Sequence, residues 1–249
     1  MDNNILLELS HQIELHSVEG IGESFRKGIN PNDSYQGKSL FDFLISMYKR
    51  SPGFKDCVKE FVKNGLEYDD SSLLAVLTND VAMLEKELDN SGELISKKFI
   101  LDCAYTPLFE VSLLHICAEF NHTQCAKILI KHGADINFKA GADKYGFGGQ
   151  TPIFHTVNQN QNNSAEMMDL LLLHKADLTY TVKGIIWGKN YPWETFIPAV
   201  NPISYAMIGM LPQMHRNEKT ISQVVSKLIK HAFGIEYTPG NIPNKYLST

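Results

Sequence analysis

The sequence predicts an all-α fold, in which about six helix-turn-helix units stack into a solenoid and are joined by hairpin-like loops, three of them long. Two observations predict it. Pairs of short segments with apolar residues at helical spacing recur along the chain. Several pairs end at a glycine, as at Gly28, Gly65 and Gly133, which suits the left-handed stop of a helix. Because 43% of the 249 residues are hydrophobic, we expect one domain with a sizeable core.

One segment defines the unit clearly. Residues 112–137 read SLLHICAEFNHTQCAKILIKHGADIN, with apolar residues at helical spacing on both sides of the polar pair Asn121 and His122. We expect the polar pair to break the helix, which leaves two short antiparallel helices. Basic residues come directly before the stop at Gly133, where they favour the negative end of the helix dipole.

This segment resembles an ankyrin repeat. Leu114 and His115 match the L-H of that family's T-P-L-H-x-A signature, and His132 to Asp135 read HGAD. The segment 149–179 resembles a second copy, with Thr151 and Pro152 at the start of its first helix. The other copies are weaker, and the inserted residues fall in the connections between copies.

The expected limits follow from these matches. We place the repeats at about 6–36, 37–70, 71–92, 112–137, 149–179 and 201–234. The insertions are 93–111, 138–148 and 180–200, and a C-terminal tail covers 235–249.

The resemblance implies a non-enzymatic module that binds a protein partner through its concave face and the long loops between repeats. In this family, partners contact the hairpin-like tips and the exposed positions on the first helices. The tip positions correspond here to Asp135, Asn137, Phe138 and Lys139. The first-helix positions correspond to Glu119, Phe120, Asn158 and Gln159. Phe120 is either an exposed anchor for the partner or packs under the loop 138–148.

The insertions contain five aromatic residues that we add to the predicted binding surface: Tyr145, Phe147, Trp187, Tyr191 and Trp193. The stretch GIIWGKNYPWETF, residues 184–196, shows no helical or strand period of useful length. Its rings form either an exposed hot spot or a lid packed on the fifth and sixth repeats. We favour partial burial, because two exposed tryptophans would form a large apolar patch.

Composition argues against several partners. The formal net charge is -5, so no overall positive field attracts nucleic acid or anionic lipid. No apolar stretch approaches the roughly 20 residues that span a bilayer. The first residues do not fit a signal peptide, and the four cysteines form no C-x-x-C pair. We therefore expect a cytoplasmic monomer with free thiols.

The chemical motifs are weak. Gly37-Lys38-Ser39 resembles the end of a phosphate loop, but the required first glycine is replaced by Asn32. The histidines and cysteines show no metal-ligand spacing, and no catalytic constellation is present, so we expect no cofactor and no metal. Two alternatives remain open: a cytoplasmic inhibitor or immunity-type protein that blocks a toxin or enzyme, and an enzyme or small-ligand binder with its site in the inserted loops.

Overall fold

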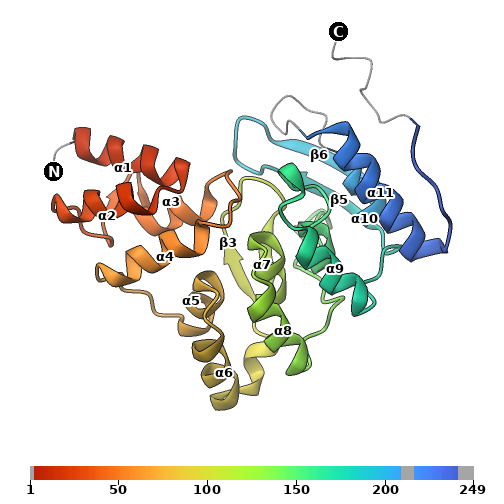
Figure 1. Cartoon of the computed structure of the whole chain (residues 1–249), viewed down its shortest axis with the longest axis horizontal. Helices are drawn as coiled ribbons and strands as arrows, with labels where there is room; N and C mark the ends of the chain where they lie inside the picture. The colour runs from red at the N-terminus through yellow and green to blue at the C-terminus, as the bar shows by residue number, and fades with distance from the viewer. Residues whose placement is uncertain (1–2, 209–215, 241–249) are drawn as a thin grey trace, which may run out of the picture.

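The helices follow one another in pairs across the molecule (Figure 1). The computed structural model describes residues 3–208 and 216–240, so parts of the predicted unit 201–234 and of the predicted tail 235–249 lie outside the described residues. The pairs are α1 (Asn3–Leu15) with α2 (Val18–Arg26), α3 (Leu40–Ser46) with α4 (Phe54–Lys63), α5 (Ser71–Thr78) with α6 (Val81–Asn90), α7 (Leu113–Phe120) with α8 (Thr123–Lys131), the 3-10 turn η2 (Pro152–His155) with α9 (Ala165–Leu173), and α10 (Pro202–Ala206) with α11 (Glu218–Phe233).

Asparagines in the turns between paired helices link one pair to the next. Asn79 and Asn121 end α5 and α7 in the left-handed conformation, with φ of 53° and 56°. Their Oδ1 atoms accept hydrogen bonds from the backbone N–H groups of Cys125 (3.3 Å) and Met167 (3.2 Å), in the first turns of α8 and α9. Each asparagine therefore terminates one helix and caps the second helix of the following pair.

A second set of asparagines links the turns that follow the second helices. The Asn137 side chain accepts a hydrogen bond from the Asp177 N–H (2.8 Å) and donates one to the Lys175 carbonyl (3.5 Å). Asn32 makes the corresponding bonds within residues 65–67. In each case the side-chain amide of the asparagine satisfies one N–H and one C=O of the neighbouring turn, which would otherwise bond to water.

The prediction of a repeat helical fold is confirmed, but the fold is not purely helical, because the connections contain small antiparallel sheets. Each sheet pairs two strands: β1 (Ser34–Tyr35) with β2 (Lys38–Ser39), β3 (Phe99–Leu101) with β4 (Leu108–Val111), and β5 (Val182–Trp187) with β6 (Thr195–Val200). Two of the three predicted insertions, 93–111 and 180–200, therefore carry hairpins. A β-hairpin satisfies most of its own backbone hydrogen bonds, so it can extend from a helical scaffold.

The stretch 184–196 is correspondingly part of a β-hairpin. Val182 pairs with Val200 and Trp187 with Thr195, without a register shift. Along β6, Ile197 and Val200 are buried, while Phe196, Pro198 and Ala199 are exposed. Neither strand alternates strictly between buried and exposed residues, so the sequence shows no strand period of useful length.

The fifth pair departs most from a regular unit. The first helix expected from Thr151 is a single 3-10 turn, and the chain then continues irregularly through η3 (Asn160–Asn162). The segment 156–163 reads TVNQNQNN, and such residues form local side-chain bonds that compete with a helix. Lys175 takes the place of the stop glycine and has a left-handed φ of 64°.

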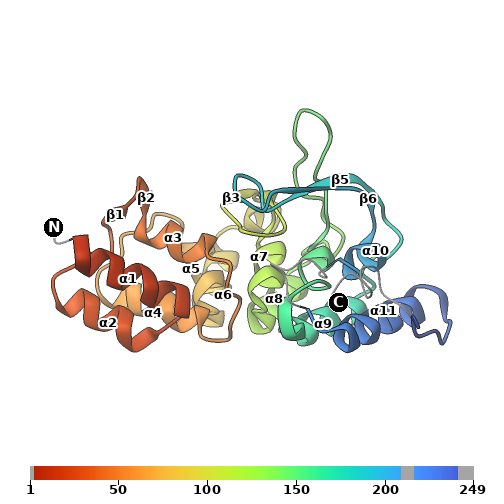
Figure 2. The same ribbon diagram turned by 90° about the horizontal axis from the view of Figure 1, so that it is seen from above.

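The strands lie on one side of the helices. Figure 2 shows β1, β2, β3, β5 and β6 together along the upper side, while α4, α6, α8 and α9 lie below. A continuous hydrophobic cluster extends beneath the strands from Leu6 in α1 to Leu228 in α11. The inserted residues therefore build a distinct face, which we call the insertion face and which consists of residues 93–111, 138–148 and 180–200.

Candidate functional site

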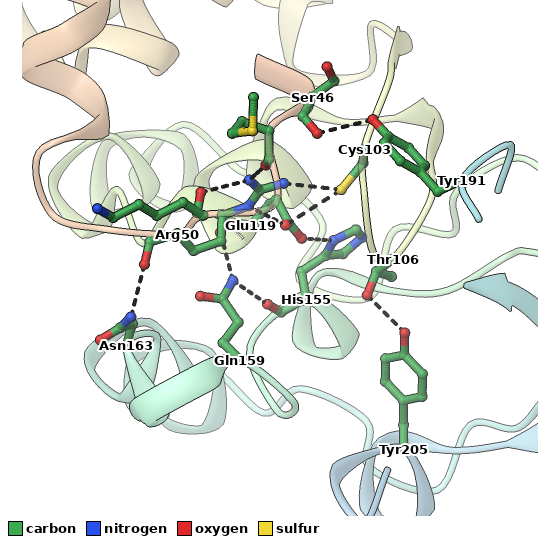
Figure 3. A network of polar contacts seen from close by, with 12 residues as sticks. Ser46, Arg50, Cys103, Thr106, Glu119, His155, Gln159, Asn163, Tyr191 and Tyr205 are labelled. Atoms are coloured by element: carbon green, nitrogen blue, oxygen red, sulfur yellow. Dashed lines mark hydrogen bonds and ion pairs between the residues drawn. The ribbon is translucent and has the colours of Figure 1, made fainter. Parts of the chain in front are cut away.

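A buried ion pair lies at the centre of the molecule (Figure 3). Arg50, in the loop between α3 and α4, donates from Nε to Glu119 Oε1 at 2.7 Å. The two side chains are only 6% and 2% exposed. Arg50 Nη2 also lies 3.3 Å from Cys103 Sγ, in the loop between β3 and β4. The ion pair thus joins the second helix pair, the fourth helix pair and the first long insertion.

The carboxylate of Glu119 is held in its charged form. His155 Nδ1 lies 2.8 Å from Glu119 Oε2. Burial by itself raises the pKa of Glu119, but Arg50 and His155 together lower it to about 2. Burial also raises the pKa of the Cys103 thiol to about 12. A carboxylate with this pKa is a weak base and this thiol is protonated at neutral pH, so the cluster suits a structural role.

Phe120 lies under the Arg50 side chain. Its ring stacks on Phe54 with 4.1 Å between centroids and an interplanar angle of 11°. The Arg50 guanidinium carbon lies 4.8 Å from the Phe120 centroid. Phe120 is therefore buried, but against α4 and Arg50 rather than under the loop 138–148. The expectation that it is an exposed anchor is wrong.

The other predicted first-helix contacts are also buried. Gln159 Nε2 donates to the backbone carbonyls of Glu119 (2.6 Å) and His155 (2.9 Å). Glu119, Asn158 and Gln159 therefore face inward, which corrects the expectation that they are exposed. The reason is the loop 47–53, which folds over this side of the helices and is fixed there by an Asn163 bond to the Arg50 carbonyl (2.9 Å).

Cavities lie beside this loop, and two of them share Arg50 in their lining. One has a volume of about 380 Å³ and is lined by residues of the inter-helix turns, including His122 and Thr123. The other has a volume of about 270 Å³ and extends towards Tyr48 and Tyr105. Arg50, Glu119 and Gln159 contribute to the walls of both cavities, so the buried ion pair lies between them.

The tip of the β5–β6 hairpin is fastened to the N-terminal half of the chain. Trp187 is 1% exposed and stacks on Tyr105 with 5.4 Å between centroids. Trp193 Nε1 donates to the Ala104 carbonyl (2.9 Å), and Tyr191 Oη donates to the Ser46 carbonyl (3.1 Å).

Burial of this tip is the interpretation that the sequence favoured. Trp187 is buried, and Tyr191 and Trp193 are half-buried. The hydrogen-bond partners of Tyr191 and Trp193 differ from the expected ones, because the tip contacts α3 and the loop between β3 and β4. The fifth and sixth helix pairs do not supply the bonds made by Tyr191 and Trp193.

Aromatic rings are exposed elsewhere on the insertion face. Tyr145 is 59% and Phe196 50% exposed, and Phe147 lies between them. The centroids of Phe147 and Phe196 are 4.7 Å apart, and those of Tyr145 and Phe147 are 6.1 Å apart. We call these three residues the aromatic patch. It joins the loop 138–148 to the outer side of β6.

The predicted tip residues divide into two groups. Asp135 and Lys139 are exposed, as their predicted contact with a partner requires. Asn137 is used within the chain, in the bonds to residues 175–177 described above. Phe138 is half-buried, with its ring 6.1 Å from His115 in an edge-on arrangement.

Sequence reasoning missed two residues of this region. Phe196 is the residue of the patch that lies on β6, and the only signal for it was an aromatic residue in the apolar run 196–200. Arg50 gave no local signal at all, because its partners Cys103 and Glu119 are 53 and 69 residues away. Only the tertiary structure, which brings these distant residues together, identifies Arg50 as part of the site.

Residues 3–208 and 216–240 contain neither a metal-ligand cluster nor a membrane-spanning helix. That part of the chain has no group of three His, Cys, Asp or Glu residues placed to hold a metal ion. It also has no helix that is both long and apolar enough to cross a membrane.

Comparison with known proteins identifies the architecture. No curated protein matches the chain. A family model described as ankyrin repeats, in three copies, matches residues 50–182, which are 133 of the 249 residues. The matched part includes α4 to α9 and both residues of the buried ion pair. Ankyrin repeats generally mediate protein–protein interactions. The helix pairs, their left-handed turns and this match agree, and the chain belongs to the ankyrin-repeat family.

Proposed function

We propose that this protein is a non-enzymatic interaction module that binds a protein partner through its insertion face. One observation carries the proposal: Tyr145 and Phe196 are 59% and 50% exposed beside the half-buried ring of Phe147, and they are the most exposed rings of the insertions, since Phe109 is 39% exposed and Trp187 is buried. Large rings dominate binding energy at protein interfaces, and a contiguous exposed apolar patch is uncommon without a partner. The proposal moves the contact away from the first-helix positions, because Glu119, Phe120, Asn158 and Gln159 are buried.

The backbone holds the patch in place. Gly148 N–H donates to the Gly184 carbonyl (2.8 Å), which ties the loop 138–148 to β5. Lys183 Nζ donates to the Tyr145 carbonyl (2.7 Å). Rings that are already ordered lose little conformational entropy when a partner binds, so more of the contact energy remains as affinity.

The proposal extends the repeat array beyond the matched residues. Asn32, outside the match, makes the same bonds to the following turn as Asn137 within it. This correspondence supports degenerate repeats at 6–36 and 37–70, in a single solenoid with 201–234 at its other end. We propose further that the protein acts as a cytoplasmic monomer.

A comparative pull-down tests the proposal. The full-length chain, a Tyr145→Ala/Phe196→Ala variant and a Leu173→Ala control are used to capture partners from the native cell after crosslinking. Leu173 is 75% exposed on α9, outside the insertion face, so it is a matched surface change. Quantitative mass spectrometry is expected to find a protein recovered by the wild type and the control but depleted with the patch variant.

Two results would contradict the proposal. One is the recovery of no protein partner before or after crosslinking. The other is a partner that all three proteins recover equally. Thermal unfolding of each variant must show an unchanged melting temperature, since an unfolded patch variant would lose partners for a different reason.

A further inference from the structure

Lysines surround the aromatic patch. Lys183 Nζ lies 5.4 Å from the Phe147 ring centroid, and Lys144 Nζ lies 4.9 Å from that of Tyr145. Lys139 Nζ lies 4.3 Å from the ring of Tyr180, at the start of the same loop. These are cation–π distances, so each ammonium group lies beside a ring, although all three lysines are exposed to solvent.

The positive charge of these lysines is not paired at close range. Asp177 lies near Lys139, since hydrogen bonds from Thr179 and, to a smaller extent, the charge of Lys139 lower the pKa of Asp177. Among the described residues, no carboxylate oxygen lies within 4.0 Å of the Nζ atoms of Lys139, Lys144 or Lys183. The carboxylate within this loop is Asp143, and its Oδ1 accepts the backbone N–H groups of Tyr145 (2.8 Å) and Phe147 (3.0 Å). The patch is thus locally basic on a chain whose net charge is -5.

Gly184 allows the rings of Phe147 and Phe196 to pack directly against the backbone of β5. A Cβ atom at Gly184 would lie 2.6 Å from Phe196 and 3.2 Å from Phe147, both ring atoms. No left-handed φ is involved, so an alanine fits the backbone here and only the rings must move. Gly184→Ala is therefore a means of displacing the patch without removing any of its side chains.

The edge of β6 is a poor site for an added strand. The Gly184 carbonyl accepts the Gly148 N–H on the side of β5 that is away from β6. Gly184 and its cross-strand partner Pro198 therefore do not bond to each other, and the backbone groups of Pro198 point to the outer edge of β6. A proline there has no N–H to offer an incoming strand. Recognition at this face must rest on side chains.

We propose that the aromatic patch binds an acidic segment of a protein partner, with carboxylates set around an aromatic or aliphatic anchor. The inference rests on the proposed function and names the chemistry of the partner. The anchor packs on Tyr145, Phe147 and Phe196, and the carboxylates meet Lys139, Lys144 and Lys183. Charge complementarity of this kind raises the association rate and selects between partners. A peptide segment meets only the patch, whereas an anionic bilayer would also meet the negative remainder of the surface.

Fluorescence polarisation with the full-length chain tests this directly. The probes are a labelled peptide of glutamates around a central tryptophan, the same peptide with glutamine for glutamate, and the same acidic peptide with alanine for tryptophan. We expect the first to bind at least about tenfold more tightly than either of the others, and its Kd to rise severalfold between about 50 and about 300 mM salt.

Variants assign the binding to the patch. Lys144→Glu/Lys183→Glu is expected to weaken binding of the acidic tryptophan peptide by about tenfold or more, and Gly184→Ala to weaken it by severalfold. Lys86→Glu/Lys127→Glu changes the charge equally at exposed positions on α6 and α8, and is expected to bind as the wild type does. Melting temperatures close to that of the wild type verify the fold of each variant.

Several outcomes would overturn the inference. They are equal binding of the glutamine peptide, equal weakening by the control variant, or preferential binding to vesicles containing phosphatidylserine over the acidic peptide. The captured partner separates this inference from the proposed function. A partner lost with Tyr145→Ala/Phe196→Ala but retained with Lys144→Glu/Lys183→Glu leaves the interaction module standing and rejects the acidic class.

Discussion

At the scale of single residues, the buried charges of Arg50 and Glu119 are paired, whereas the buried guanidinium of Arg216 donates to the backbone carbonyls of residues 157, 206 and 208. Arg50 and Glu119 neutralise each other, and His155 completes the hydrogen bonding of the carboxylate. Burial by itself lowers the pKa of Arg50, but Glu119 raises it above its ordinary value. The guanidinium therefore stays charged, and each charge depends on the other for solvation.

Removal of one partner is expected to be costly. Arg50→Met leaves the Glu119 carboxylate buried without its cation, so the free energy of unfolding should fall by about 3–5 kcal/mol. Chemical denaturation of the single variants and of Arg50→Met/Glu119→Leu measures the coupling, and the double variant should lose less than the sum of the singles. Lys27→Met is the control, since its exposed pair with Glu8 is worth less than about 1 kcal/mol. Strict additivity would contradict this account.

Two buried histidines, His115 and His122, have lowered pKa values and are bonded to the backbone or to a hydroxyl group. His115 lies 2.9 Å from the Ser112 hydroxyl and 3.0 Å from the Gln150 carbonyl, which joins two repeats. His122 donates from Nδ1 to the Val76 carbonyl at 2.7 Å, since a carbonyl can only accept. His115 is thus a structural histidine, as its place in the ankyrin signature implies.

At the scale of elements, asparagine side chains in the turns join neighbouring repeats by hydrogen bonds. Asn79 and Asn121 each combine a left-handed conformation with a side-chain acceptor for the next unit. A glycine supplies only the first property, and a serine or aspartate in an ordinary conformation supplies only the second. This dual demand explains why asparagine stands at both turns.

Substitutions at Asn121 separate the two contributions. Asn121→Gly keeps the left-handed turn and loses the cap on α9, so it should destabilise by about 1 kcal/mol. Asn121→Ala also adds backbone strain of about 1 kcal/mol, so it should destabilise further. Urea unfolding is expected to rank the wild type first, Asn121→Gly second and Asn121→Ala third. An alanine variant as stable as the glycine variant would exclude the strain.

The β5–β6 hairpin is the element that fastens the two halves of the chain. Trp187→Ala opens a large cavity beside Tyr105 and should lower the unfolding free energy by about 3–5 kcal/mol. Phe196→Ala, on the exposed side of the same hairpin, should change it by less than about 1 kcal/mol. Trp187→Ala/Trp193→Ala should lower the melting temperature by several degrees.

Hydrogen exchange locates the effect. The amides of Gly188 and Tyr191, which are bonded in the hairpin tip, should lose protection first in Trp193→Phe, because that change removes only the bond to the Ala104 carbonyl. Uniform loss of protection over the whole chain would show that the tip does not open separately.

At the scale of the whole molecule, the buried histidines make stability depend on pH. Burial is the main cause that lowers the pKa of His16 and His122 to about 4 and that of His115 to about 3, from 6.5. The unfolded chain therefore takes up protons before the folded chain does as the pH falls. The stabilisation is complete above about pH 6.5 and declines towards pH 4. Glu119, with its pKa lowered to about 2, adds a further loss below about pH 4.5.

The melting temperature should accordingly fall between pH 7.5 and 5.5. Each of these buried histidines costs about 1.4 kcal/mol for every pH unit below its unfolded value. His122→Gln keeps a donor for the Val76 carbonyl and removes one titrating group, so its melting temperature should fall less steeply with pH. Equal slopes for the wild type and His122→Gln, or a constant melting temperature over this range, would contradict the prediction.

The sequence by itself determined the repeated helix pairs and the family, because apolar spacing, stop glycines and the L-H and T-P signatures act within one unit. It also indicated burial of the tryptophans at the hairpin tip. The face that remains exposed was decided by tertiary structure alone. Arg50 meets Cys103 and Glu119 across 53 and 69 residues, and Tyr191 meets Ser46 across 145.

Such contacts leave no local period, since their side chains come from separate turns and loops. The chain closes on itself there because a charged or polar group leaves water only where a partner replaces it. That closure buries the predicted first-helix contacts, whereas Tyr145 and Phe196 remain exposed and Phe147 half-buried on the insertion face.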